Sequence, residues 1–154
     1  NLLIDEINFN IKGLVDRIDR VGDLYRIIDY KTGLVQSSDL VFDDFNDLIK
    51  NPKKNKSLQL LIYSYLYLKS NPNTLKQQVV AGNFSFRNIK EEFIVVSKRI
   101  SSRDIRPLNI NQQNLIEIEN ILKSILKSII YDDFQQTEDF SRCEWCEYKQ
   151  ICKR

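Results

Sequence analysis

Two runs of alternating apolar and polar residues, joined by a short glycine-containing turn, most constrain the fold of this chain. Segments 13–19 and 27–33 follow the two-residue period of half-buried β-strands. Gly22-Asp23 lies between them with glycine first, which is typical of a two-residue type II′ loop. A hairpin closed by this loop places Val21 opposite Leu24 and Ile18 opposite Ile27. The same register predicts that Asp16 faces Asp29.

The predicted hairpin brings two carboxylates and an amine together. Directly opposed β-carbons lie roughly 4.5–5.5 Å apart, and like charges there are destabilising unless something neutralises them. Lys31 shares the face of Asp29, whereas Tyr30 points to the other face. Asp16, Asp29 and Lys31 therefore predict an oxygen site for Mg²⁺ or Mn²⁺ beside an ammonium that can orient a water. The alternative is an ordinary charged hairpin with one solvated face, because a lone Asp-x-Lys recurs by chance.

A helix is predicted over residues 57–68, with Ser57 as its N-cap. Gln59 and Tyr63 are one turn apart on this helix, so both side chains lie on one face. A polar pair at that spacing can hold a phosphate or the edge of a nucleobase. The alternative is that Tyr63 simply covers the sheet, together with Tyr65 and Tyr67.

The remaining pattern predicts a mixed sheet flanked by helices. Residues 1–10 lead into or form part of a first strand, and residues 34–55 form an excursion with a short helix. Segments 78–86 and 92–97 are rich in β-branched and aromatic residues, as strands are. Apolar residues at three- and four-residue steps predict an amphipathic helix over 111–130. This order predicts one α/β domain over residues 1–154, with a mixed central β-sheet flanked by α-helices.

The three cysteines of the chain lie close together near its end, at Cys143, Cys146 and Cys152. Clustered cysteines in the segment 143–152 favour thiolate ligation of a metal over core filling. Four thiolates are the usual complement for an iron–sulfur cluster or a structural zinc, so these three do not close such a site alone. Three free thiols, or one disulfide with a spare thiol, are the alternatives.

These motifs, taken in order, resemble the PD-(D/E)XK nuclease superfamily and in particular its RecB-like branch, which includes AddB-type nucleases. The resemblance rests on Gly-x-x-Asp-Arg-x-Asp, Ile-Asp-Tyr-Lys-Thr-Gly and Gln-Leu-x-x-Tyr between residues 12 and 63, and on the cysteines. It implies a restriction-endonuclease-like core, with Asp16, Asp29 and the Tyr30 carbonyl as metal ligands. It also implies that Lys31 is the catalytic lysine and that Gln59 and Tyr63 are accessory substrate residues.

The resemblance also indicates which residues are missing from the pattern. RecB-like nucleases usually supply a metal-binding histidine from a preceding helix, and AddB-type enzymes supply a fourth cysteine from upstream. This chain contains no histidine and no cysteine before Cys143. We therefore expect a carboxyl-terminal part of a longer protein, lacking the amino-terminal helix and possessing reduced or no activity by itself. A [4Fe-4S] cluster is then expected only in the full-length protein.

Charge and composition bear on partners and location. A net charge of +2 is too small to indicate nucleic-acid binding by itself, but basic residues gather in two predicted loops. These are Lys50, Lys53, Lys54 and Lys56 in one loop and Lys98, Arg99, Arg103 and Arg106 in the other. Either group can track a phosphate backbone, and the alternative is ordinary solvated loops. The chain has no long apolar run and no signal peptide, which favours a cytoplasmic location without membrane contact.

The expected function is metal-dependent, exonuclease-type hydrolysis of DNA. The resemblance implies single-stranded DNA or ends unwound by a helicase partner, in double-strand-break repair and recombination. The first alternative is a catalytically silent nuclease fold that binds DNA or docks onto a helicase. A metal-binding interaction module built around the cysteines is the second.

Overall fold

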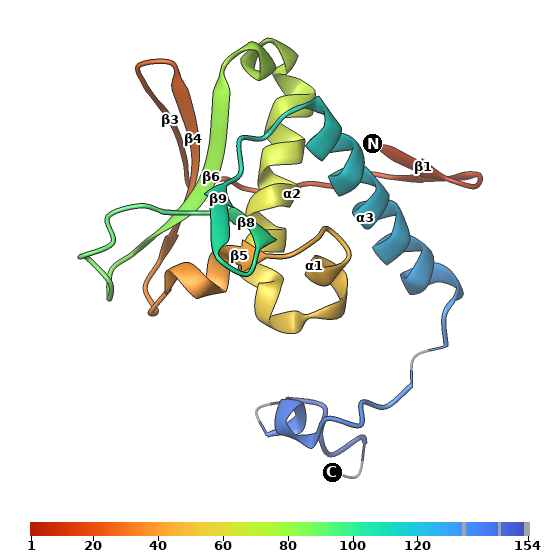
Figure 1. Ribbon diagram of the computed structural model, residues 1–154. Coiled ribbons are helices and arrows are strands. Elements are labelled where there is room, and N and C mark those ends of the chain that lie inside the picture. Colours follow the sequence, from red (N-terminus) through yellow and green to blue (C-terminus); the bar gives the residue numbers. More distant parts are fainter. Residues whose placement is uncertain (134, 145, 153–154) are drawn as a thin grey trace.

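The computed structural model describes residues 1–133, 135–144 and 146–152 as a mixed α/β arrangement (Figure 1). Its two long helices are α2 (Asn55–Ser70) and α3 (Gln112–Tyr131). The central sheet has the strand order β3-β4-β6-β7, in which β4 and β6 are parallel and the other neighbours are antiparallel. Its strands are β3 (Arg17–Val21), β4 (Leu24–Lys31), β6 (Gln78–Ser85) and β7 (Ile94–Val95). The predicted fold class is therefore confirmed.

Two smaller sheets and several short helices complete the described part. The strands of the small sheets are β1 (Leu2–Ile4) with β2 (Ile7–Phe9), and β5 (Val41–Phe42) with β8 (Ser97–Ser101) and β9 (Asp104–Pro107). The short helices are η1 (Ser37–Leu40), α1 (Asp47–Lys50), η2 (Pro52–Lys54), η3 (Pro72–Lys76) and η4 (Phe140–Cys143).

The β3–β4 hairpin has the predicted register. Gly22 has a φ of +61°, which the first position of a type II′ loop requires, and Ile18 pairs with Ile27. The paired strand begins at Arg17, which lies opposite Ile28, so Asp16 comes just before the ladder. The turn chemistry is local, and for that reason the register follows directly from the sequence.

Helix α2 covers one face of the central sheet and carries the main core. Leu60 and Leu61 of α2 are fully buried against Ile27 of β4 and Val79 of β6. Helix α3 packs against α2 and β1 through its apolar stripe, including Ile118 (Figure 1). The β4–α2–β6 connection is a helical crossover between two parallel strands, which places the carboxyl ends of both strands at the same edge.

Several local predictions were wrong. Residues 98–106 are not a loop, because β8 and β9 pair as an antiparallel hairpin there. Ser57 is not the N-cap of α2: the helix begins two residues earlier, and the buried Ser57 hydroxyl donates to the Asp39 carbonyl instead. Residues 1–10 form a separate two-stranded sheet and do not join β3.

The end of the chain lies apart from the sheet. After α3 the backbone runs away from the core and reaches η4 (Figure 1). Within the described residues, none of the helices combines the length and apolar character needed to cross a membrane.

Candidate metal and substrate site

The end of β4 brings the predicted lysine into contact with a buried carboxylate. Asp29 and Lys31 share the face of β4 that packs toward α2, because side chains alternate along a strand. Lys31 Nζ lies 2.7 Å from Asp29 Oδ2. The Asp29 side chain is only 7% exposed and that of Lys31 is 27% exposed. A carboxylate this buried requires a cationic or hydrogen-bonding partner, and Lys31 supplies one.

Helix α2 adds the two predicted accessory residues to this pair. Lys31 Nζ donates a 2.8 Å hydrogen bond to Gln59 Oε1. Gln59 Nε2 donates in turn to the Tyr63 hydroxyl at 3.0 Å. Asp29, Lys31, Gln59 and Tyr63 therefore form one continuous polar row between β4 and α2. The alternative that Tyr63 only covers the sheet does not account for its hydroxyl, which accepts the hydrogen bond at the end of this row.

Asp16, which directly precedes β3, contacts the backbone of β4 at the edge that faces β3. Its Oδ2 accepts a 2.8 Å hydrogen bond from the backbone N–H of Tyr30. That N–H belongs to the peptide group joining Asp29 to Tyr30, so Asp16 adjoins the backbone of the second carboxylate. The backbone N–H and C=O of one strand residue point to the same edge, which places the Tyr30 carbonyl on the Asp16 side.

Sequence reasoning missed Asn83, which contacts Asp29 from the neighbouring strand. Asn83 lies opposite Asp29 in the parallel β4–β6 register and is fully buried. Its Nδ2 donates to Asp29 Oδ2 at 2.9 Å and to the Asp29 carbonyl at 3.0 Å. The one available signal was a polar amide within the otherwise apolar strand 79–84.

The donor chemistry at this edge fits a hard divalent cation. Asp16 and Asp29 supply carboxylate oxygens, and the Tyr30 carbonyl is a backbone oxygen beside them; Mg²⁺ and Mn²⁺ prefer such ligands. Within residues 1–133, 135–144 and 146–152, no group of three or more His, Cys, Asp or Glu side chains surrounds a point where a metal ion could sit. A cation here would therefore need backbone, water or substrate oxygens to complete its coordination, as Mg²⁺ commonly does.

A groove opens beside the polar row. It has a volume of about 600 Å³ and is lined by one residue of β4 and by residues of α2 between Asn55 and Tyr63. The lining residues are Lys31, Asn55, Lys56, Leu58, Gln59, Ile62 and Tyr63. Two lysines and two amides on an open groove suit a polyanion more than an apolar ligand.

The predicted basic residues do not all reach this groove. Lys56 lines it, and the Lys56 ammonium pairs with Asp39 at 3.0 Å. Lys53 and Lys54 lie in η2, directly before α2, where Lys54 Nζ donates to the Ser38 carbonyl. Arg99 and Arg103 belong to the β8–β9 hairpin of another sheet, and Arg99 pairs with Asp43. Only Lys56 among these five joins the lining of the groove.

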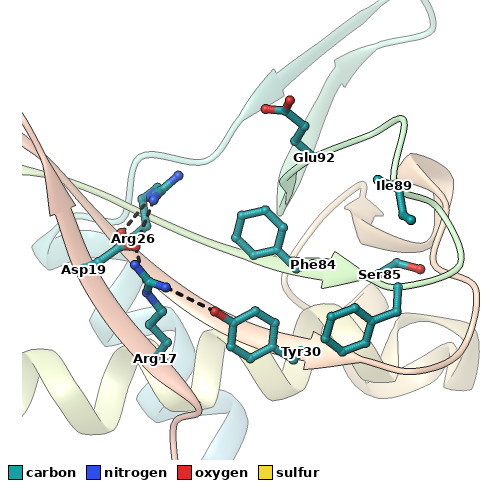
Figure 2. Close-up of a pocket in the computed structure, with 9 residues that line it drawn as sticks. Arg17, Asp19, Arg26, Tyr30, Phe84, Ser85, Ile89 and Glu92 are labelled. Atoms are coloured by element: carbon teal, nitrogen blue, oxygen red, sulfur yellow. Dashed lines mark hydrogen bonds and ion pairs between the residues drawn. The ribbon is translucent and has the colours of Figure 1, made fainter.

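The opposite face of β4 carries side-chain contacts that stabilise the β3–β4 hairpin (Figure 2). Asp19 accepts two hydrogen bonds from Arg26 across the hairpin, at 2.7 and 2.8 Å, and also pairs with Arg17. The hydrogen bond from Arg26 holds the pKa of Asp19 below its usual value. Arg17 approaches the Tyr30 hydroxyl at 3.5 Å, and the Tyr30 ring stacks on Phe84. Arg17 and Asp19 therefore stabilise the hairpin that carries Asp16 and Asp29.

The three cysteines stand apart from this site. Cys143, Cys146 and Cys152 are free and partly exposed. They do not form a metal-binding group within the described residues, and residue 145 of this segment lies outside them. Three thiolates are one short of the usual four, so this donor set does not fit a closed cluster by itself.

Comparison with known proteins assigns the chain at the level of a superfamily. The profile described as PD-(D/E)XK nuclease superfamily matches residues 2–153, which is nearly the whole chain. Searches of curated proteins and of solved structures gave no match.

Proposed function

The chain belongs to the PD-(D/E)XK nuclease superfamily, and from this membership we propose that it acts as a metal-dependent deoxyribonuclease domain. The observation that carries the proposal is the continuous row Asp29–Lys31–Gln59–Tyr63 beside an open groove. Nucleases of this superfamily are generally hydrolytic, commonly use Mg²⁺ or Mn²⁺ and act on DNA. The row places an ammonium, which can stabilise negative charge on a phosphoryl oxygen, next to a buried carboxylate that can bind a cation.

The proposed chemistry divides among named residues. Asp16, Asp29 and the Tyr30 carbonyl would hold the cation, which supplies charge neutralisation at the scissile phosphate and makes water more acidic. Lys31 orients the attacking water or a phosphoryl oxygen through its ammonium. Gln59 keeps the Lys31 ammonium at the groove, because Gln59 Oε1 accepts a hydrogen bond from one of its three N–H groups. Tyr63 fixes the orientation of the Gln59 amide.

We propose single-stranded or unwound DNA as the substrate, cleaved by an exonuclease-type reaction. The groove presents Lys31 and Lys56 to a phosphate backbone, while the amides of Asn55 and Gln59 can contact phosphate or base edges. A RecB-like role in double-strand-break repair beside a helicase is the biological setting that we propose. Lys53 and Lys54 directly precede Asn55 of the groove in the chain and would add positive charge near it. Arg99 and Arg103 would meet DNA only if it also crossed the β8–β9 hairpin.

We retain the proposal that Cys143, Cys146 and Cys152 contribute thiolates to an iron–sulfur or zinc site. Its support is their clustering and the reactivity of thiolates toward soft metals. Elemental analysis for iron and zinc, made on the protein isolated from its native cells and on a triple Cys→Ser variant expressed there, tests this proposal independently of cleavage. Equal metal content in both proteins would contradict it.

The decisive experiment measures cleavage and metal binding on the same protein. A fluorescent single-stranded oligonucleotide is incubated with the chain in Mn²⁺, in Mg²⁺ and in EDTA. Lys31→Ala and Asp29→Ala should each lower the rate by about 10²-fold or more, since each removes a group acting on the transition state. Asp23→Asn, a carboxylate change in the turn of the same hairpin, should leave the rate unchanged.

The outcomes separate the proposal from its alternatives. Mn²⁺-dependent cleavage lost in the two site variants supports a nuclease. Binding of Mn²⁺ and DNA without any cleavage would instead fit a catalytically silent nuclease fold, or the reduced activity expected of a chain without a histidine ligand. Failure to bind Mn²⁺ at all would overturn the proposed site.

A further inference from the structure

Asn83 is a buried amide that contacts the proposed catalytic row but is not part of it. Its side chain is fully buried on β6, yet among the described residues its Oδ1 is a buried side-chain oxygen without a hydrogen-bond partner. Leaving a buried acceptor unpaired is costly, and replacing the whole amide by an apolar side chain removes that cost. The presence of an amide here, despite this cost, points to its other half, the Nδ2 donor.

Both hydrogen bonds of that donor go to Asp29. Nδ2 reaches the Asp29 carbonyl at 3.0 Å and Asp29 Oδ2 at 2.9 Å, which fixes the backbone and the carboxylate of one residue together. Lys31 also binds Oδ2, at 2.7 Å. The hydrogen bond from Asn83 and the ion pair with Lys31 both use Oδ2, so Oδ1 is the oxygen that can bind a metal ion.

We propose that Asn83 is a positioning residue for the metal site, which holds the Asp29 carboxylate in one rotamer with Oδ1 available for a divalent cation. This inference rests on the proposed function. A ligating carboxylate whose second oxygen is anchored by a hydrogen bond loses less side-chain freedom when it binds the metal. Asn83 supplies this anchor from a different strand, so the carboxylate is set by the sheet and not by β4 alone.

Asn83 also keeps the Asp29 carboxylate paired when Lys31 moves. Asp29 Oδ2 and Gln59 Oε1 occupy two of the three N–H donors of Lys31, and a shift of the ammonium toward water or substrate would weaken its contact with Asp29. If Lys31 were the only partner of Oδ2, that movement would leave a buried, charged oxygen without a partner. Because Asn83 keeps its own bond to Oδ2, the lysine can shift while the carboxylate stays paired and in place.

Mn²⁺ binding, measured by titration calorimetry without DNA, tests this role apart from activity. Asn83→Ala removes the donor, and the Mn²⁺ dissociation constant should rise about tenfold or more, as for other residues that orient metal ligands. The matched control is Ser85→Ala, two residues further along the same face of β6. Ser85 is also buried and hydrogen-bonded, but to Gly33 and Val35, not to Asp29. Asn83→Ser, whose shorter side chain cannot span to Asp29, repeats the test if the alanine variant unfolds.

The result expected is weaker Mn²⁺ binding in the Asn83 variants and unchanged binding in Ser85→Ala, with thermal unfolding showing that all remain folded. Unchanged Mn²⁺ affinity in a folded Asn83 variant overturns the positioning role, whatever the loss of thermal stability. A wild-type chain that does not bind Mn²⁺ would instead overturn the proposed function itself. The two failures are therefore distinguishable in one experiment.

Discussion

Lys31 Nζ and Gln59 Oε1 lie 2.8 Å apart, joining the last residue of β4 to the second turn of α2. The same ammonium also contacts Asp29, so a helix and a strand together determine where the lysine points. Gln59 is itself tied to Tyr63 one turn later. We therefore expect substitutions of Gln59 to displace Lys31 while Asp16 and Asp29 keep their positions.

We expect Gln59→Leu to lower the rate of DNA cleavage by about tenfold to a hundredfold while leaving Mn²⁺ affinity unchanged, because only the support of the Lys31 amine is lost. Tyr63→Phe removes only the last hydroxyl of the row and should have a smaller effect. Initial rates at saturating Mn²⁺ and a parallel calorimetric titration measure both quantities. Equal rates for Gln59→Leu and the wild type would show that the hydrogen bond to Lys31 has no catalytic part.

Substitution of Asp16 separates its charge from its hydrogen bond. Asp16→Asn keeps an oxygen that can accept from the Tyr30 N–H but removes the charge, so Mn²⁺ affinity should fall at least about tenfold with little change in stability. Asp16→Ala should also lose roughly 0.5–1.5 kcal/mol of unfolding free energy. Calorimetric titration and urea denaturation give the two values. Wild-type Mn²⁺ affinity in Asp16→Asn would exclude Asp16 as a ligand.

Glu119 of α3 makes the stability of the fold depend on pH. Hydrogen bonds from Lys123 and Lys69, together with one from the Tyr65 hydroxyl, lower the pKa of Glu119 from 4.5 to about 2. A carboxylate with a lowered folded-state pKa stabilises the fold above its unfolded pKa of 4.5 and loses this contribution as pH falls toward 2. Burial raises the pKa of Tyr65, the partner in α2.

We therefore expect Glu119→Gln to reduce the free energy of unfolding at pH 7 by about 1–2 kcal/mol, since solvent screens the half-exposed lysines. The difference from the wild type should shrink below pH 4.5 and be largely gone near pH 2. Urea denaturation across this pH range measures it, with Glu117→Gln on the same helix as the control. A difference that stays constant with pH would contradict the ionic origin.

Gly82 precedes Asn83 and allows β7 to approach β6 closely. A methyl group added there would overlap the Ile94 carbonyl oxygen and come within 2.7 Å of the Phe93 ring. Gly82→Ala should destabilise the fold by about 1–3 kcal/mol or more, because backbone cannot yield as a flexible side chain can. The control is Gly33→Ala, where the added methyl meets no described atom within 4 Å. Thermal or urea unfolding compares the two, and similar stabilities would contradict this packing.

The sequence by itself determined the elements whose causes are local. The Gly22-Asp23 turn set the hairpin register, apolar spacing identified α3, and residue composition identified α2 and the strand β6. These features depend on turn chemistry and on the periods of strands and helices, which are written in neighbouring residues. The motifs also led to the superfamily that the profile match shows.

Only the tertiary structure decided which distant groups meet. Lys31 reaches Gln59 because α2 crosses the sheet, and Asn83 reaches Asp29 because β6 pairs with β4 in parallel, after 54 residues of chain. A parallel pairing is set by burial of both strands under the crossover helix, not by a turn, so no local pattern predicts its register. The buried role of Ser57 was missed for the same reason, because its partner Asp39 lies 18 residues earlier in the chain. The β8–β9 hairpin is local, but its strands are rich in Lys and Arg and were predicted as a basic loop.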